Sequence, residues 1–213
     1  MNPLRYIGKK PVIFLLRHGE ARLDGVKRFV GQLDVPLTGR GRKQAEAWAR
    51  WFSSIPLVRV VASDLRRTRD TARIIAAGRE LTLELDPRLR EIDLGEWEGK
   101  SIEEVKTRNP KQYALRGKDL AGYHPPAGES FADVQRRVVP VFIRLVEKLQ
   151  GNLLIVSHAG VNRTILCRLL GMSLENLFRL SQDYGALNIV EPQEGRYRLH
   201  TLNLTAESLW MGK

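Results

Sequence analysis

Cysteine is almost absent from this sequence. The 213 residues contain one, Cys167, which follows Ile165 and Leu166 in an apolar run. A single cysteine excludes a disulfide within the chain, and it leaves a cysteine-based metal site without enough ligands. Apolar neighbours are typical of a cysteine that packs as a small core residue on a helix. We therefore expect Cys167 to be structural.

Long hydrophobic runs are also missing. No stretch approaches the roughly 20 apolar residues that a membrane-spanning helix needs, which predicts that a membrane is not a partner. The first ten residues, MNPLRYIGKK, contain no apolar segment of signal-peptide length, so we expect a cytoplasmic protein. Repeats, low-complexity tracts and linkers are absent as well, which favours a single domain over residues 1–213.

Acidic residues are in the minority. The sequence has 24 Asp and Glu residues against 35 Lys and Arg residues, and its formal net charge is +11. A strongly basic chain attracts anionic partners, which include phosphorylated metabolites, nucleic acids and membrane surfaces. The charge alone does not choose among them.

Runs rich in Val, Ile and Leu predict the strands. They cover residues 11–16, 57–62, 81–85, 152–156, 186–190 and 196–202. Helical spacing of apolar residues separates most of them, over 41–52, 66–77, 130–149 and 160–170. This alternation predicts an α/β fold, a three-layer α/β/α sandwich whose central sheet has about six mostly parallel strands. The last run alternates between apolar and polar residues, which indicates an antiparallel strand at the edge.

Residues 100–129 interrupt this pattern. Ser101 and Glu104 form a capping-box motif, and Pro110 is expected to end the short helix that this motif begins. The following segment, 111–129, is rich in Gly and Pro, and we expect it to be less regular. We interpret 100–129 as a flap that covers the substrate within the single domain.

Charged and polar side chains follow four of the predicted strands. Arg17 and His18 follow the first strand, and His158 follows the fourth. Arg67 comes shortly after the second strand, and Glu91 shortly after the third. Because ligands bind beyond the carboxyl ends of parallel strands, we expect these residues to share one site.

This combination of side chains suits the transfer of a phosphoryl group. A neutral imidazole can attack phosphorus and hold it covalently. Guanidinium groups neutralise phosphoryl oxygens through paired hydrogen bonds, without a metal. Glycine lets the backbone approach a phosphate, and a helix N-terminus adds amide donors. A carboxylic acid is needed to protonate the leaving oxygen and then to accept a proton from water.

Six segments together resemble the successive signatures of the histidine phosphatase superfamily, the phosphoglycerate mutase-like group. They are LLRHGEA, GQLDVPLTGRGRKQA, SDLRRTRDTA, LREIDLGEWEG, PAGES and VSHAGVNR. They occur in the order typical of the family and span about residues 11–165. The tripeptide RHG alone would be a weak signal, whereas the whole set is highly specific.

The resemblance implies a role for each matching residue. His18 is the nucleophile that becomes phosphohistidine, and Arg17 and Arg67 hold the phosphoryl group. Arg67 is chosen among its arginine neighbours because it matches the last position of the family's S-x-L-x-R pattern. His158 donates a hydrogen bond to a phosphoryl oxygen and stabilises the transition state. Glu91 is the proton donor to the leaving group, with Asp93 as the second candidate.

Further phosphate contacts are expected from the backbone. The resemblance implies that Ala159 and Gly160, which follow His158, contribute to the phosphate pocket. Gln32, in the segment FVGQLD, is a candidate additional ligand.

The segment after His18 departs from the family. Many relatives read R-H-G-E-[ST]-x-W-N, and this chain reads RHGEARLD. Ala21 lacks the hydroxyl group, and Asp24 replaces an asparagine that often touches phosphate. An anionic Asp24 would repel a phosphate dianion. We therefore expect Asp24 to turn away, toward Arg22 or Lys27, or the substrate to be held differently.

Three functions stay open at this point. A phosphomonoesterase would pass the phosphoryl group from His18 to water, and a mutase would return it to another hydroxyl. Mutases of the family resemble E-R-H-Y-G after the acid, whereas residues 91–95 read EIDLG, and the segment up to His158 is shorter than in mutases. Both differences favour a phosphatase. A nucleic-acid or polyanion binder with a vestigial site is the third possibility, although no aromatic-basic strand motif supports it.

The length of the chain and the PAGES segment resemble the α-ribazole phosphatase branch of the family. The first candidate substrate is therefore α-ribazole 5′-phosphate, with a broad range, phosphoserine, phosphorylated sugars and phosphoglycerate as alternatives. We expect a small phosphorylated substrate, no cofactor, no metal, no nucleic-acid partner and no membrane partner. A homodimer is compatible with the sequence.

Overall fold

The computed structural model describes residues 10–210 and contains a six-stranded sheet. Its strands are β1 (Ile13–Arg17), β2 (Arg59–Ala62), β3 (Leu83–Leu85), β4 (Leu153–Ser157), β5 (Leu187–Gln193) and β6 (Arg196–Leu204). Their order across the sheet is β3-β2-β4-β1-β5-β6. Strand β5 is antiparallel to both of its neighbours, and the other neighbouring strands pair in parallel. The mostly parallel sheet is confirmed, and β6 is its predicted edge strand.

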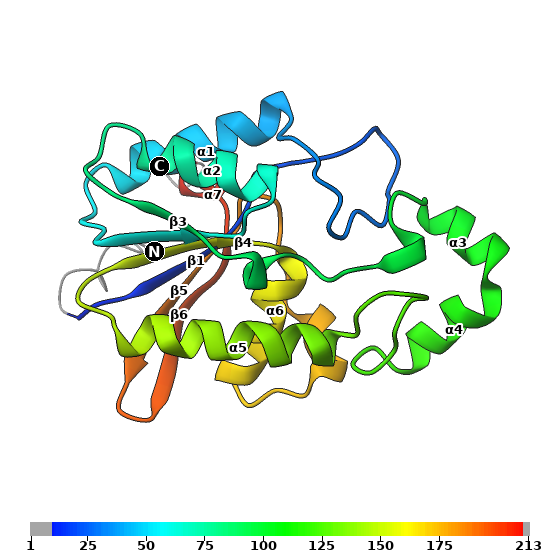
Figure 1. Ribbon diagram of the computed structural model, residues 1–213. Helices are drawn as coiled ribbons and strands as arrows, with labels where there is room; N and C mark the ends of the chain where they lie inside the picture. The colour runs from blue at the N-terminus through cyan, green and yellow to red at the C-terminus, as the bar shows by residue number, and fades with distance from the viewer. Residues whose placement is uncertain (1–9, 211–213) are drawn as a thin grey trace.

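Helices cover both faces of this sheet (Figure 1). On one face lie α1 (Gly39–Phe52), α2 (Arg66–Ala76) and α7 (Ala206–Trp210), and on the other lie α5 (Phe131–Glu147) and α6 (Ala159–Leu169). Short 3-10 helices, η2 (Pro87–Leu89), η3 (Gly95–Trp97) and η4 (Leu174–Arg179), connect these elements. The predicted three layers are therefore present. None of the helices within residues 10–210 is long and apolar enough to cross a bilayer.

The apolar run of β1 serves both faces of the sheet. Because successive strand side chains point to opposite faces, Phe14 and Leu16 pack into the core beneath α1, against Trp48. Ile13 and Leu15 pack into the opposite core, which α5 and α6 cover. These four strand side chains and Trp48 are all fully buried. A strand that buries both faces belongs inside a sheet, and β1 lies between β4 and β5.

The register of β1 and β4 brings the ends of the two strands to the same level. Arg17 pairs with Ser157, the last residue of β4. The amide of His18 then donates to the carbonyl oxygen of Ser157 at 3.0 Å. His158 follows Ser157 directly, so the two histidines emerge side by side from the carboxyl edge of the sheet.

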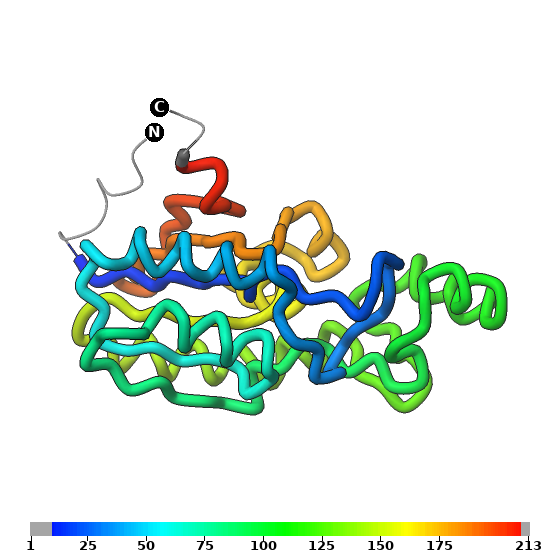
Figure 2. The backbone as a smooth tube through the Cα atoms, turned by 90° about the horizontal axis from the view of Figure 1, so that it is seen from above, coloured from blue at the N-terminus to red at the C-terminus, as the bar shows by residue number. Residues whose placement is uncertain are grey.

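Residues 100–129 form a separate group beyond that edge, as the two views in Figures 1 and 2 show. The capping box of Ser101 and Glu104 opens α3 (Ile102–Arg108), as predicted. Pro110 ends this helix region and also begins a second helix, α4 (Pro110–Lys118). Proline suits the first helical position because that amide needs no partner within the helix. The expectation of a less regular chain was therefore wrong for residues 111–118.

The first turn of α1 packs directly against the backbone that follows His18. The amide of Thr38 donates to the carbonyl oxygen of Glu20 at 2.9 Å. A Cβ atom on Gly41 would overlap that carbonyl oxygen and lie 2.7 Å from the amide nitrogen of Glu20. A Cβ atom on Gly19 would overlap the carbonyl of Gly41 in turn. Both glycines are required because the two backbones touch.

Alanine substitutions at two glycines of α1 test this contact. Gly41→Ala should lower the free energy of unfolding by about 1–3 kcal/mol, the usual cost of overpacking, although alanine favours helix. Gly39→Ala, in the same turn, has open space around its added methyl group and should be neutral or stabilising by about 0.4–1 kcal/mol. Urea denaturation measures both. Equal effects of the two substitutions would show that the close approach does not matter.

Candidate active site

The rings of His18 and His158 lie next to each other at the carboxyl edge of the sheet, with their planes inclined at 64°. Their centroids are 5.2 Å apart, and both residues are almost completely buried, with exposed fractions of 4% and 0%. The structure therefore brings together the two histidines that the strand ends predicted. Arg17, Arg67 and Glu91 line the same pocket as His18.

The hydrogen bonds of His18 define its reactive nitrogen. Nδ1 lies 2.7 Å from the carbonyl oxygen of Gly19, which can only accept, so Nδ1 carries the proton of the neutral ring. Nε2 presents its lone pair and accepts a hydrogen bond from Nε of Arg67 at 3.2 Å. Burial, together with the positive charges of Arg67 and Arg17, holds the pKa of His18 well below its usual value. The ring is thus neutral at physiological pH, and Nε2 is its unprotonated nitrogen.

Arg67 is held rigidly beside this nitrogen. It lies in the first turn of α2 and is 2% exposed. Nη1 donates to the carbonyl oxygen of Leu33 and Nη2 to that of Gly31, each at 2.7 Å. Each terminal nitrogen carries a second N–H group. The guanidinium is therefore fixed from behind and keeps donors for an anion.

Arg17 and His158 carry buried nitrogen atoms without partners. Nη1 of Arg17 donates to the carbonyl oxygen of Gln182 at 2.6 Å, and the guanidinium lies 3.8 Å from the centroid of the Tyr184 ring. In the described part of the chain, Nε of Arg17 and both ring nitrogens of His158 are buried without a hydrogen-bond partner. A buried donor without a partner costs about 1–3 kcal/mol. A phosphoryl oxygen bound here would remove that cost.

Glu91 reaches the site from the other side, close to the first turn of α6. Its Oε1 accepts from the amide of Ile92 and its Oε2 from the amide of Gly160, each at 3.0 Å. A Cβ atom on Gly160 would overlap Oε1 of Glu91 and lie 3.1 Å from the ring of Phe131. Gly160 therefore makes room for the carboxylate. Ala159 lines the pocket. A phosphate contact from the Ala159 and Gly160 amides stays a prediction.

Gln32 lies behind Glu91 and is not among the residues that line the pocket. Its Nε2 donates to the backbone carbonyl oxygen of Glu91 at 3.2 Å. The contact that the structure shows is therefore with the segment that carries the acid. A direct phosphate contact of Gln32 stays a prediction.

Asp24 turns away from the phosphate region, as its charge suggested. Its carboxylate accepts from Nε and Nη2 of Arg28, with distances of 2.8–3.1 Å. These bonds lower the pKa of Asp24. The expected partners were Arg22 or Lys27, and the partner is instead the next basic residue along the chain. Arg28 also donates to the carbonyl oxygen of Gly99 at 2.9 Å, so the pair connects this loop to the start of the flap.

The outer wall of the pocket combines aromatic rings with guanidinium groups. Phe29, Phe131 and Phe178 line it together with Arg116 and Arg163, and the pocket has a volume of about 220 Å³. The guanidinium carbons of Arg163 and Arg116 lie 5.2 and 5.8 Å from the centroid of the Phe178 ring. Phe178 is 47% exposed, which is unusual for a large aromatic residue. Arg163 ends the VSHAGVNR segment, but the sequence predicted no role for it or for the other four residues, which come from separate elements.

Guanidinium groups supply the positive charge of the pocket. Glu91 is the one carboxylate among the residues that line it. Across residues 10–210, neither Arg116 nor Arg163 forms an ion pair with Asp or Glu. The same range contains no group of three or more His, Cys, Asp or Glu side chains that could hold a metal ion. The pocket is suited to an anion.

The two buried histidines should make the protein less stable in mild acid. Burial lowers the pKa of both His18 and His158, so the unfolded chain binds more protons than the folded chain below pH 6.5. The free energy of unfolding should therefore fall as pH falls below 6.5, by up to about 1.4 kcal/mol per pH unit for each histidine. Urea denaturation at pH 7.5 and 5.5 measures this loss. The double variant His18→Gln/His158→Gln should lose less, and an unchanged loss would contradict the prediction.

Comparisons with known proteins agree with this geometry. The sequence model of the histidine phosphatase superfamily (branch 1) matches residues 13–205. The adenosylcobalamin/α-ribazole phosphatase of Escherichia coli is 30% identical over 91% of this chain and 96% of its own length. Phosphoserine phosphatase 1 of Hydrogenobacter thermophilus is 33% identical over 91% of this chain and 92% of its own length. The crystal structure of the α-ribazole phosphatase of Shigella flexneri superimposes with a TM-score of 0.83 at 29% identity, and the match covers 91% of this chain and 96% of that one. This chain belongs to the histidine phosphatase superfamily.

Proposed function

We propose that this protein is a metal-independent phosphomonoester hydrolase that acts through a phosphohistidine on a small phosphorylated metabolite. The observation that carries the proposal is the environment of Nε2 of His18. Its lone pair is presented by the bond between Nδ1 and Gly19, and Nε of Arg67 donates to it. Arg17 lines the same pocket, and the ring of His158, whose nitrogens have no partner among the described residues, lies 5.2 Å away between centroids. A nucleophile ringed by positive charge and unpartnered donors is what a phosphoryl dianion requires.

In the first step, Nε2 of His18 attacks phosphorus and forms a nitrogen–phosphorus bond. The bond between phosphorus and the alcohol oxygen breaks, and its electron pair stays with that oxygen. Arg17 and Arg67 neutralise the phosphoryl oxygens, and His158 donates to one of them. Glu91, in its acid form, gives its proton to the leaving oxygen, and the alcohol departs.

In the second step, water attacks the same phosphorus from the side that the alcohol has vacated. The Glu91 carboxylate takes a proton from this water. The bond from phosphorus to Nε2 breaks, and its electron pair returns to the ring. Inorganic phosphate leaves, and His18 is again neutral because its Nδ1 proton never moved.

The segment after Glu91 favours water over a second hydroxyl as the phosphoryl acceptor. Ile92 and Leu94 are each 7% exposed, and both belong to the hydrophobic core. They also line the pocket. In the E-R-H-Y-G pattern that mutases of the family resemble, an arginine follows the acid. In this chain the corresponding residue is Ile92, which is buried and apolar. This supports the phosphatase over mutase-type transfer.

Replacing the nucleophile tests the mechanism. His18→Ala should lower the kcat of p-nitrophenyl phosphate hydrolysis by at least about 10³-fold, because no other group forms the covalent intermediate. Addition of EDTA to the wild type should leave the rate unchanged. Acid-labile, base-stable phosphate should label the wild type after a rapid quench, and not the variant.

Two results would refute the mechanism: undiminished activity in His18→Ala, or loss of wild-type activity in EDTA. The polyanion-binding alternative predicts a different pattern. It requires an inactive wild type and nucleic-acid binding that survives His18→Ala and weakens steeply with salt.

The first candidate substrate is α-ribazole 5′-phosphate. The names of the similar E. coli and S. flexneri proteins support it. The outer wall supports it as well, because aromatic rings and guanidinium planes can stack on a planar base. In this proposal, residues 100–129 cover the alcohol half of the substrate, since Arg116 of α4 lines the pocket.

A panel of phosphomonoesters tests this substrate. The kcat/KM of α-ribazole 5′-phosphate should exceed that of ribose 5-phosphate, which lacks the base, by about tenfold or more, as stacking one base contributes about 1–3 kcal/mol. Phe178→Ala should reduce the kcat/KM of α-ribazole 5′-phosphate more than that of ribose 5-phosphate. If phosphoserine or 3-phosphoglycerate has a higher kcat/KM than α-ribazole 5′-phosphate, the substrate proposal is wrong. Arg116 and Arg163 would then bind the carboxylate of the substrate. The cytoplasmic location and the homodimer stay predictions.

A further inference from the structure

The general acid of the proposed reaction stands on a loop. Glu91 lies within residues 90–94, which belong to no helix or strand. Sites built on loops are less accurate than sites built on regular elements, unless other groups hold the loop. A displacement of about 1 Å can cost roughly a hundredfold in rate. Glu91 therefore needs other groups to hold its backbone in place.

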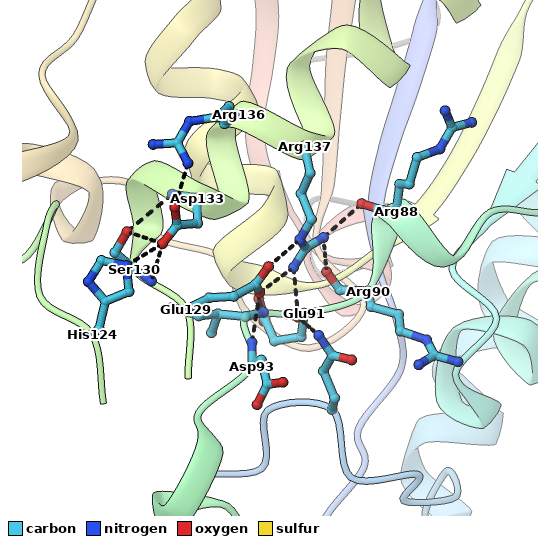
Figure 3. Close-up of polar contacts among 12 residues, drawn as sticks. Arg88, Arg90, Glu91, Asp93, His124, Glu129, Ser130, Asp133, Arg136 and Arg137 are labelled. Carbon is cyan, nitrogen blue, oxygen red and sulfur yellow. Dashed lines mark hydrogen bonds and ion pairs between the residues drawn. The ribbon is translucent and has the colours of Figure 1, made fainter. Parts of the chain in front are cut away.

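Arg137, in the second turn of α5, binds the backbone on which Glu91 stands (Figure 3). Its Nη1 donates to the carbonyl oxygens of Arg88 and Arg90, at 2.7 and 2.8 Å. Its Nη2 donates to the carbonyl oxygen of Glu91 itself, at 3.0 Å. One guanidinium therefore fixes three carbonyl groups on the chain that leads to the acid.

Glu129 completes this arrangement from the end of the flap. Its Oε1 accepts from Nε of Arg137, and its Oε2 accepts from Nη2, each at 2.8 Å. Oε2 also accepts from the amide of Asp93 at 2.9 Å, and the amide of Glu129 donates to the carbonyl oxygen of Asp93 at 2.8 Å. The chain is thus held on both sides of Glu91.

The guanidinium of Arg137 has no donor to spare. An arginine side chain has five N–H groups, and Arg137 makes five hydrogen bonds, three to carbonyl oxygens and two to Glu129. Its side chain and that of Glu129 are 21% and 25% exposed. Neither residue lines the pocket, and every N–H group of the Arg137 side chain is already bonded within the protein.

We propose that Arg137, locked by Glu129, is a positioning residue for the general acid, a role that rests on the proposed function. It fixes the backbone of residues 88–93. The carboxyl group of Glu91 then reaches the amide of Gly160 at one end and the leaving oxygen at the other. Loss of Arg137 removes three hydrogen bonds from the backbone that carries Glu91, whereas His18 and Arg67 keep hydrogen bonds of their own.

This role has a signature that a merely structural role lacks. A good leaving group such as p-nitrophenolate needs little protonation, and a poor one such as phenolate needs the acid. Arg137→Gln should therefore lower the kcat/KM of phenyl phosphate by about tenfold or more beyond its effect on p-nitrophenyl phosphate. Glu129→Gln should shift the ratio in the same direction, and Arg137→Lys should restore part of it.

The matched control is Arg136→Gln. Arg136 is the preceding residue of α5, is 76% exposed and pairs only with Asp133 among the described residues. It should leave the ratio of the two kcat/KM values unchanged. Glu91→Gln should raise leaving-group sensitivity, and adding Arg137→Gln to it should raise the sensitivity no further, because both changes remove the same proton transfer.

The outcomes separate the inference from the proposed function. Equal losses on both substrates in Arg137→Gln and Glu129→Gln would overturn the positioning role, as would a further increase in the double variant. If Arg137→Gln does not fold by circular dichroism, Glu129→Gln, which keeps the size of the side chain, decides in the same way. A wild type that does not hydrolyse p-nitrophenyl phosphate, or a His18→Ala variant that does, would refute the proposed function instead.

Discussion

The parallel pairing of β1 with β4 is the interaction on which the site depends. It places Arg17 opposite Ser157, and the two histidines that follow these strands meet at a ring separation of 5.2 Å. A slip of one residue would send each side chain of β1 to the opposite face of the sheet. Such a slip would exchange Phe14 and Leu15 between the two cores, and these side chains differ in size and shape. The hydrophobic core thereby sets the geometry of the nucleophile.

Much of the fold and the inner site could be predicted because their signals are local. Each of the six strands is a continuous or alternating apolar run, and capping residues such as Thr38 and Ser101 mark where helices begin. The strand ends then led to His18 and His158, because parallel strands present their carboxyl ends at one edge. The assignment of Arg67 and Glu91 needed the motifs as well, since neither adjoins a strand directly.

The rest could not be predicted because its signals are not local. Arg137 lies 46 residues after Glu91 in sequence and contacts its backbone, yet it directly follows Arg136, an exposed residue of the same type. The helical pattern places Arg137 beside the buried stripe, three residues after Val134 and four before Val141, but it does not tell which backbone Arg137 contacts. The position of Arg116 could not be predicted either. The sequence predicts the end of a helix at Pro110, whereas Pro110 also begins α4, the helix that contains Arg116. The outer wall is assembled from such distant segments of the chain, and in the proposed function it contacts the alcohol half of the substrate.

The burial of β1 on both faces has a consequence for the residue that follows it. Regions that open locally are those with few buried contacts, whereas central strands open only when the whole molecule unfolds. His18 directly follows such a strand, and its amide is bonded to β4. A movement of residues 100–129 would leave the backbone that carries His18 in place, because that backbone belongs to the central strands. In the proposed mechanism, the position of the phosphorylated ring is therefore as stable as the sheet that carries it.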